Sequence, residues 1–163
     1  MARISIIGSG YVGLVYATAF ADLGNDVTGI DIDADKVARL QRGECPIFEP
    51  GLPELLARNL EAGRLRFTTS YADAVPQSEF VSVCVDTPQS FNGEADMRAV
   101  RRAATTIAEH LHGHTIIVNK STMPIGSGDL VAKILEEHTP AGATFSVVSN
   151  PEFLRDAPRD LLG

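Results

Sequence analysis

Short apolar runs recur along the chain, and segments with apolar residues three or four positions apart lie between them. A short apolar run is typical of a buried strand, and the wider spacing is typical of a helix with one buried face. Glycines, prolines and acidic residues separate many of these segments and interrupt regular structure. This pattern predicts strands at residues 3–7, 25–31, 64–69, 79–85, 115–120 and 144–149.

Helices are expected in the intervening segments, with Asp33 and Asp96 as the N-caps of two of them. The expected helices span residues 11–23, 33–41, 52–61, 71–75, 96–111 and 128–137. Strands that alternate with helices along a chain form a parallel sheet that is covered on both faces. The sequence therefore predicts an α/β fold, a doubly wound parallel six-stranded Rossmann sheet with strand order 3-2-1-4-5-6.

The pattern shows no internal boundary, so we expect a single domain over residues 1–156. Residues 157–163 contain no strand or helix pattern, and we interpret them as a truncated tail where the natural chain would go on. The chain has 163 residues, 44% of them hydrophobic and 21% charged, which is an ordinary globular balance. Its net charge of −7 argues against a nucleic-acid-binding surface.

Targeting and redox signals point to the cytoplasm. No apolar run approaches the roughly 18 residues of a membrane span, and the first strand starts at the N-terminus without a signal peptide. Two cysteines, Cys45 and Cys84, are too few for a disulfide framework and fit a reducing compartment. We therefore expect a cytoplasmic protein that does not bind a membrane.

A glycine motif follows the first expected strand. Gly8, Gly10 and Gly13 match the spacing G-x-G-x-x-G, in which the first glycine permits a tight turn. The second glycine lets a diphosphate approach the backbone, and the third lets the next helix pack closely on the sheet. The amides at the start of that helix then face the phosphates. Alone, these glycines are equally compatible with a plain structural turn.

The second expected strand ends in Asp31, 23 positions after Gly8. An acid roughly 20 positions after the motif accepts hydrogen bonds from the adenosine ribose, although Asp31 is also compatible with a helix cap. Both features together predict dinucleotide binding. A carboxylate repels a 2′-phosphate, and no arginine follows it, so the sequence favours NAD over NADP. Lys36, the only nearby cation, either caps the edge of this site or is a solvated helix residue.

Polar residues follow three more strands at the edge of the sheet where ligands bind in such folds. Thr87 and Thr122 could hydrogen-bond the nicotinamide ribose, or a substrate through water, and each could instead only cap a turn. Glu152 could act as a general base or acid, or be a structural carboxylate bonded to nearby backbone. These residues are the candidates for the reacting end of the site.

The cysteines and histidines are poor candidates for chemistry. Cys84 lies within an apolar strand and Cys45 lies near two glutamates, and both environments disfavour a thiolate. The sequence therefore predicts structural roles for both. His110, His112 and His114 do not have the spacing of metal ligands, and no metal is expected.

Several blocks of the sequence, in this order, are shared with one family of dehydrogenases. The blocks are Gly8–Leu14, Gly29–Asp33 with Lys36 and Val37, Pro46–Leu52, Thr87–Pro88, Lys120–Gly126 and Ser149–Arg155. On these blocks, the chain resembles the N-terminal NAD-binding domain of the UDP-glucose/GDP-mannose dehydrogenase family across residues 2–156. The glycine block is common to many families, whereas the later blocks are specific.

The resemblance implies oxidation of a sugar-nucleotide alcohol to a carboxylate with two NAD, through intermediates bound to a cysteine. It implies a role in UDP-glucuronate and polysaccharide biosynthesis. Thr122 would help to hold the reacting water, and Glu152 would assist thioester hydrolysis. The implied cofactor contacts are Gly8, Gly10, Tyr11, Val12, Gly13, Asp31, Lys36, Thr87, Ser121, Thr122 and Asp156. The implied substrate contacts are Glu152, Phe153, Leu154, Arg155 and Asp156.

The family's nucleophilic cysteine, central helix and substrate domain have no counterpart in these residues, and Asp156 stands where the family usually has glutamate. We therefore expect the chain to bind NAD but not to turn over UDP-glucose or a related sugar nucleotide alone, and we expect the full-length protein to be a homodimer. One alternative is a free-standing NAD-binding sensor or interaction module without catalysis. Another is a different Rossmann dehydrogenase, which would need a histidine near the nicotinamide.

Overall fold

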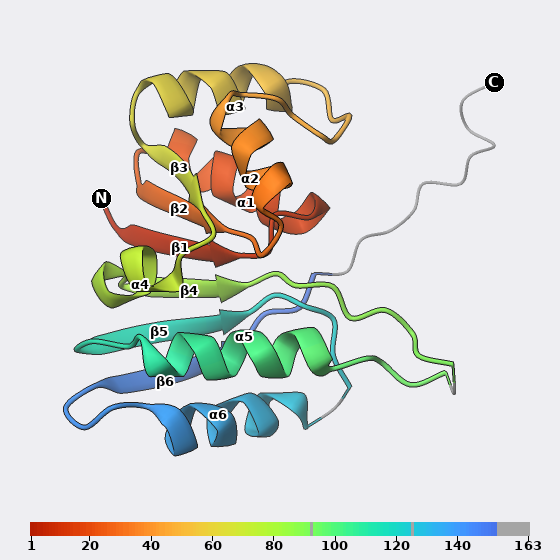
Figure 1. Cartoon of the computed structure of the whole chain (residues 1–163), viewed down its shortest axis with the longest axis vertical. Coiled ribbons are helices and arrows are strands. Elements are labelled where there is room, and N and C mark those ends of the chain that lie inside the picture. Colours follow the sequence, from red (N-terminus) through yellow and green to blue (C-terminus); the bar gives the residue numbers. More distant parts are fainter. Residues whose placement is uncertain (92, 125, 153–163) are drawn as a thin grey trace.

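A parallel sheet forms the centre of the computed structural model, which describes residues 1–91, 93–124 and 126–152. Within these ranges the strands are β1 (Arg3–Ile7), β2 (Asp26–Ile30), β3 (Leu65–Thr68), β4 (Phe80–Val83), β5 (His114–Asn119) and β6 (Thr144–Ser149). They pair in the order β3-β2-β1-β4-β5-β6, and every pairing is parallel (Figure 1). The predicted fold class and strand order are confirmed.

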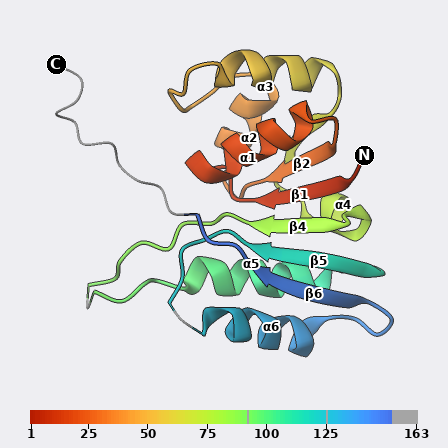
Figure 2. The ribbon, with the colours of Figure 1, turned by 180° about the vertical axis from the view of Figure 1, so that it is seen from behind.

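Helices cover both faces of this sheet. In the described residues they are α1 (Tyr11–Asp22), α2 (Ala34–Gln41), α3 (Leu52–Glu61), α4 (Tyr71–Ala74), the 3-10 turn η1 (Val75–Gln77), α5 (Arg98–Glu109) and α6 (Ser127–His138). Figures 1 and 2, seen from opposite sides, show α5 and α6 on one face and α1 on the other. None of the helices within the described ranges is long and apolar enough to cross a membrane.

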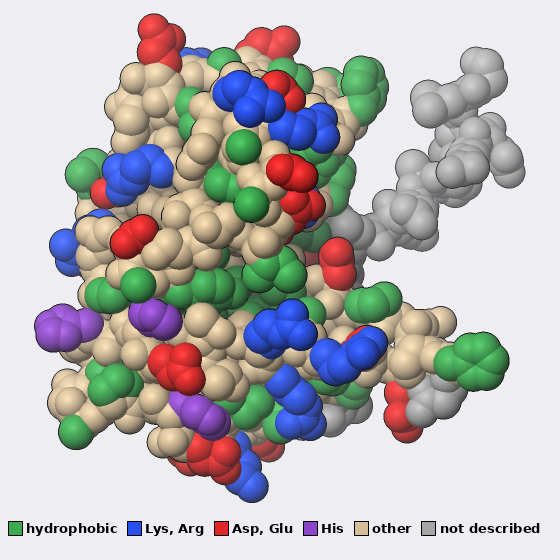
Figure 3. Space-filling model, in the orientation of Figure 1, with side chains coloured by type: hydrophobic (Ala, Val, Ile, Leu, Met, Phe, Trp, Pro, Cys, Tyr) green, Lys and Arg blue, Asp and Glu red, His purple; other side chains and the backbone are tan. Residues whose placement is uncertain are grey.

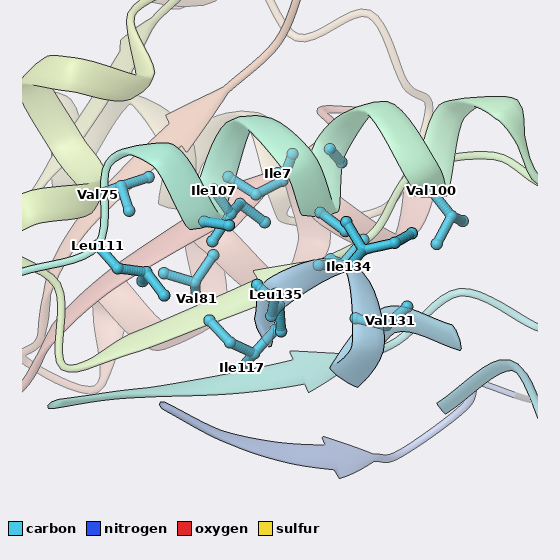
Figure 4. Packing of buried hydrophobic residues seen from close by; sticks show 14 of the residues in the cluster. Ile7, Val75, Val81, Val100, Ile107, Leu111, Ile117, Val131, Ile134 and Leu135 are labelled. Carbon is cyan, nitrogen blue, oxygen red and sulfur yellow. The ribbon is translucent and has the colours of Figure 1, made fainter. Parts of the chain in front are cut away.

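The sheet separates two clusters of buried hydrophobic residues. One cluster lies under α5 and α6 and joins them to the middle strands (Figure 4). Ile117 on β5, Ile107 on α5 and Leu135 on α6 are fully buried there. The other cluster joins α1, α2 and α3 to β1, β2 and β3. Side chains of parallel strands alternate between the faces, so β1 and β2 contribute buried residues to both clusters.

All predicted boundaries lie within two residues of the observed ones, but of the two predicted N-caps only one is confirmed. Asp33 accepts a hydrogen bond from the backbone N–H of Lys36 and is the N-cap of α2, as predicted. Asp96 is not the N-cap of α5, because that position belongs to Met97. The carboxylate of Asp96 instead holds the guanidinium and the backbone N–H of Arg98.

Candidate functional site

The turn between β1 and α1 packs directly against neighbouring backbone, with no room for a side chain at two of its glycines. Gly8 has a φ of +95°, and a Cβ at that position would lie 2.8 Å from the carbonyl oxygen of Cys84. A Cβ on Gly13 would lie 1.8 Å from the carbonyl oxygen of Gly8. Real atoms cannot approach so closely, so these two glycines are required by the packing of α1 on the ends of β1 and β4.

Gly10, between them, is different. Its φ of −72° suits any residue, and a Cβ there would have only the side-chain oxygen of Asp86 nearby, at 3.7 Å. Gly10 is the N-cap of α1, and no side chain caps the helix and no acidic residue lies in its first turn. The first amides of a helix have no partner within the helix and attract anions. A bare backbone therefore faces open space at a position suited to a phosphate.

A cavity of about 520 Å³ adjoins this turn, at the carboxyl ends of β1, β2 and β4. Its lining includes Gly8, Ser9 and Gly10. Arg98 and Arg102 of α5 also line it. Figure 3 shows basic side chains gathered over α5 on this face of the molecule. The lining also holds Asp31, Asp33, Asp86 and Asp96, and Arg98 is paired with Asp96, so among the described lining residues the acidic side chains outnumber the basic ones. An anionic ligand would therefore depend on the backbone amides at Gly10 and not on a basic surface.

Asp31, at the end of β2, lies in this cavity with its carboxylate fixed by neighbours. Its Oδ2 accepts hydrogen bonds from the N–H of Ser9 at 2.8 Å and from Lys36 Nζ at 2.9 Å. Its Oδ1 accepts a hydrogen bond from the N–H of Asp33 at 3.0 Å. Burial alone would raise the pKa of Asp31, but these hydrogen bonds outweigh it, and the pKa lies below its ordinary value. Lys36 therefore belongs to the edge of the site.

A second cavity, of about 430 Å³, lies on the other side of Gly10. It shares Gly10, Cys84, Val85 and Asp86 with the first cavity, so the two adjoin. Predicted residues from separate segments meet in this second cavity: Tyr11, Val12, Thr87, Ser121, Thr122 and Glu152. An extended ligand with a diphosphate at Gly10 would therefore have one end near Asp31 and the other near Glu152.

The aliphatic hydroxyl groups in the second cavity, those of Thr87, Ser121 and Thr122, already donate hydrogen bonds to the backbone. Thr87 donates to the carbonyl of Thr122 at 2.7 Å, and Thr122 donates to the carbonyl of Glu152 at 3.1 Å. Ser121 donates to the carbonyl of Val85 at 2.6 Å. These contacts support the turn-capping alternative for both threonines. Each oxygen can still accept a hydrogen bond, so a ligand contact here requires a donor on the ligand, such as a ribose hydroxyl.

Glu152 is held by two side chains that sequence reasoning did not place in the site. Tyr16 donates a hydrogen bond to Glu152 Oε2 at 2.6 Å, and Lys120 Nζ lies 3.2 Å from the same oxygen. The hydrogen bond from Tyr16, together with Lys120, lowers the pKa of Glu152, so this carboxylate is ionised at neutral pH. Tyr16 lies one helical turn after Val12 of the glycine motif, and that spacing could have placed it at the site.

The remaining predicted residues are placed as follows. Tyr11 is exposed, and its hydroxyl donates to Glu49 at 2.6 Å. Burial raises the pKa of the Cys84 thiol to about 12, so the thiol stays protonated and is a poor nucleophile. Cys45 is not among the residues that line either cavity, and its thiol donates to Ile47. Phe153, Leu154, Arg155 and Asp156, and the tail at 157–163, lie outside the described residues.

The histidines lie away from both cavities. His110 and His138 hydrogen-bond the carbonyl four residues earlier in their own helices, and His114 contacts Thr144. No histidine is among the described residues that line the cavities, so a dehydrogenase that uses a histidine near the nicotinamide is not supported. Among residues 1–91, 93–124 and 126–152, no group of three His, Cys, Asp or Glu side chains could hold a metal ion.

Comparison with known proteins matches this chain to one family of sugar-nucleotide dehydrogenases. The model of the UDP-glucose/GDP-mannose dehydrogenase family, NAD binding domain, matches residues 2–159. The UDP-glucose 6-dehydrogenase TuaD of Bacillus subtilis is 48% identical over 156 residues, which are 96% of this chain and 34% of that protein. The GDP-mannose 6-dehydrogenase of Azotobacter vinelandii is 40% identical over 161 residues, which are 95% of this chain and 37% of that protein.

A solved structure extends the likeness to the backbone. The UDP-glucose dehydrogenase from the archaeon Pyrobaculum islandicum superposes with a TM-score of 0.89 at 42% identity. The match covers 95% of this chain and 37% of that one. The chain thus spans about a third of the length of the relatives it matches.

The hydrogen bonds of Asp31 predict how the stability of the domain depends on pH. The pKa of Asp31 in the folded state is below 3.8, so its ionised form stabilises the fold above pH 3.8, and this contribution is lost as the pH falls through the folded pKa. We expect Asp31→Asn to lower the free energy of unfolding by about 1.5–3 kcal/mol at pH 7, the range for hydrogen bonds to charged groups.

Urea denaturation of both proteins at pH 7 and at successively lower pH checks this expectation, with Asp35→Asn as a control. Asp35 lies in the first turn of α2 but is exposed and lines neither cavity. The stability difference should shrink below pH 3.8 for Asp31→Asn and be small throughout for the control. A difference that is independent of pH would contradict the ionised, hydrogen-bonded state of Asp31.

Proposed function

The chain belongs to the UDP-glucose/GDP-mannose dehydrogenase family, as its NAD-binding domain, and we propose that it is the cofactor half of a UDP-glucose 6-dehydrogenase. The observation that carries the proposal is the unobstructed backbone at Gly10, between a carboxylate at each end of the adjoining cavities. The choice of UDP-glucose is supported by the higher identity to the Bacillus subtilis enzyme than to the GDP-mannose enzyme.

The residues present fit NAD. The diphosphate would lie against the first amides of α1 at Gly10, where a side chain would fill the space. Asp31 Oδ1 accepts one hydrogen bond, from the N–H of Asp33, and its second lone pair can accept one from the adenosine ribose, since Ser9 and Lys36 both use Oδ2. The nicotinamide end would then lie in the second cavity, beside Thr87 and Thr122. When bound there, NAD supplies the hydride acceptor.

Within this proposal the chain's own residues do two things at the reacting end. The hydroxyl oxygens of Thr122 and Thr87 accept hydrogen bonds and so orient the ligand, because their protons are already donated to the backbone. The ionised Glu152 accepts a proton from the water that hydrolyses the thioester, as the family resemblance implies. The nucleophile is proposed to lie in a part of the enzyme outside this chain, because Cys84 and Cys45 are unsuitable.

Calorimetry with NAD, NADP and UDP-glucose on this chain tests the proposal. We expect binding of NAD alone, because Asp31 repels a 2′-phosphate and the described cavities are assigned to the cofactor. Asp31→Ala should weaken NAD binding roughly tenfold to a hundredfold, the equivalent of losing a hydrogen bond to a charged group.

The control for this variant is Asp35→Ala, which removes an equal charge from the exposed side of α2 and should leave NAD affinity unchanged. Failure of the unmodified chain to bind NAD would overturn the proposed function. Equal affinity for NAD and NADP would instead overturn the role of Asp31 alone.

Turnover by the chain alone is a separate expectation. With NAD and UDP-glucose we expect no formation of NADH, because both described cavities are assigned to the cofactor and we expect UDP-glucose not to bind. Neither cysteine can supply the nucleophile that the second oxidation, from aldehyde to thioester, requires. Absorbance of NADH is the measurement, with a full-length UDP-glucose 6-dehydrogenase as the positive control. Steady NADH formation that scales with the concentration of this chain would contradict the proposed division of the enzyme.

A further inference from the structure

Three segments that are distant in the sequence meet at one carboxylate oxygen. Tyr16 comes from α1, Lys120 directly follows β5, and Glu152 follows β6. The Tyr16 hydroxyl donates to Glu152 Oε2 at 2.6 Å, and Lys120 Nζ lies 3.2 Å from the same atom. Among the described residues, these side-chain contacts all reach Oε2, which leaves the lone pairs of Oε1 available to a ligand in the second cavity.

Lys120 makes this contact from the protein interior. Its side chain is 4% exposed, whereas the side chain of Glu152 is 31% exposed. The ammonium group also lies 4.4 Å from the centre of the Tyr16 ring, within the range of a cation–π interaction. A buried charge is tolerated only where partners compensate for the lost water. Glu152 and Tyr16 therefore both compensate for the water that the buried ammonium group has lost.

We propose that Tyr16 and Lys120 are positioning residues that hold Glu152 by Oε2 and present Oε1 to the second cavity as a fixed, ionised proton acceptor. The step assigned to Glu152 rests on the proposed function, but the geometry of the three side chains does not. A proton acceptor must be ionised before the reaction and oriented toward its proton donor. A carboxylate held by only one partner could rotate and exchange its two oxygens.

The pKa shifts of Glu152 and Lys120 agree with this arrangement. The hydrogen bond from Tyr16 and the charge of Lys120 lower the pKa of Glu152. Burial alone would lower the pKa of Lys120, but the contacts with Tyr16 and Glu152 outweigh it and raise the pKa, so the ammonium stays charged. A lower pKa makes a carboxylate a weaker base. The two partners therefore secure the orientation and ionisation of Glu152 near neutral pH, not its strength as a base.

Other titratable groups face the same cavity and must be considered in a pH experiment. Cys84 on the β4 side is protonated, because burial raises its pKa to about 12. Asp86, which follows β4, is a second carboxylate in the lining, and the phenol of Tyr11 donates to Glu49 on the other side. Asp86 is thus the second carboxylate of this cavity whose signal must be distinguished from that of Glu152.

Carbon-13 NMR of the glutamate carboxyl groups distinguishes Glu152 from Asp86, because Asp86 gives no signal when only glutamate carries the isotope. The signal of Glu152 is assigned by its disappearance in Glu152→Gln. We expect the titration midpoint of Glu152 to move to higher pH in Tyr16→Phe and in Lys120→Met, and to stay near the unmodified value in Lys120→Arg, which keeps the charge. Tyr11→Phe, a tyrosine change in the same cavity whose hydroxyl contacts Glu49, should leave the midpoint unchanged.

Unchanged midpoints in both Tyr16→Phe and Lys120→Met would overturn the proposal. Lys120→Met removes a buried charge, and if it does not fold, Tyr16→Phe decides alone, because it keeps the ring and loses only the hydroxyl. Urea denaturation of each variant shows whether the fold is intact. The titration requires no NAD, so failure of the chain to bind NAD would remove the proposed function and leave this positioning to be judged separately.

Discussion

The close approach of α1 to the ends of β1 and β4 is the constraint on which the rest of the site depends. A Cβ on Gly13 would lie 1.8 Å from the carbonyl oxygen of Gly8, so α1 can begin directly above the sheet only because Gly13 has no side chain. This packing places the first amides of α1 between the two adjoining cavities. Gly8 and Gly13 therefore permit the close packing that forms the site, and Gly10 leaves space for a ligand beside the backbone.

At each end of the site a lysine contacts a carboxylate. At the end of β2, Lys36 contacts Asp31 at 2.9 Å, and at the other end Lys120 contacts Glu152 at 3.2 Å. In each pair the lysine contacts one carboxylate oxygen, and both carboxylates have lowered pKa values. The surroundings differ, because Asp31 is also fixed by backbone amides, whereas Glu152 depends on side chains. A substitution near Glu152 can therefore alter its orientation more readily.

Much of this arrangement follows from local sequence. Strand order and the positions of Gly8 and Asp31 are predictable, because apolar spacing and one short motif specify them. Asp96 was predicted as the N-cap of α5, but the N-cap is Met97, and the Asp96 carboxylate binds the first backbone N–H of the helix, that of Arg98, from one residue earlier. The contact between Tyr16 and Glu152 spans 136 positions, and no local pattern signals such a pairing. Sequence reasoning thus found the candidate acid and missed the side chains that hold it.

The central claim is that a bare backbone at Gly10 binds the diphosphate of NAD, and Gly10→Ala measures it directly. The backbone there suits alanine, so we expect the free energy of unfolding to change by less than about 1 kcal/mol. Calorimetry should nevertheless show NAD affinity reduced by roughly tenfold or more, because the new methyl group would fill the space of the phosphates. A stable variant that binds NAD as tightly as the unmodified chain would contradict the account.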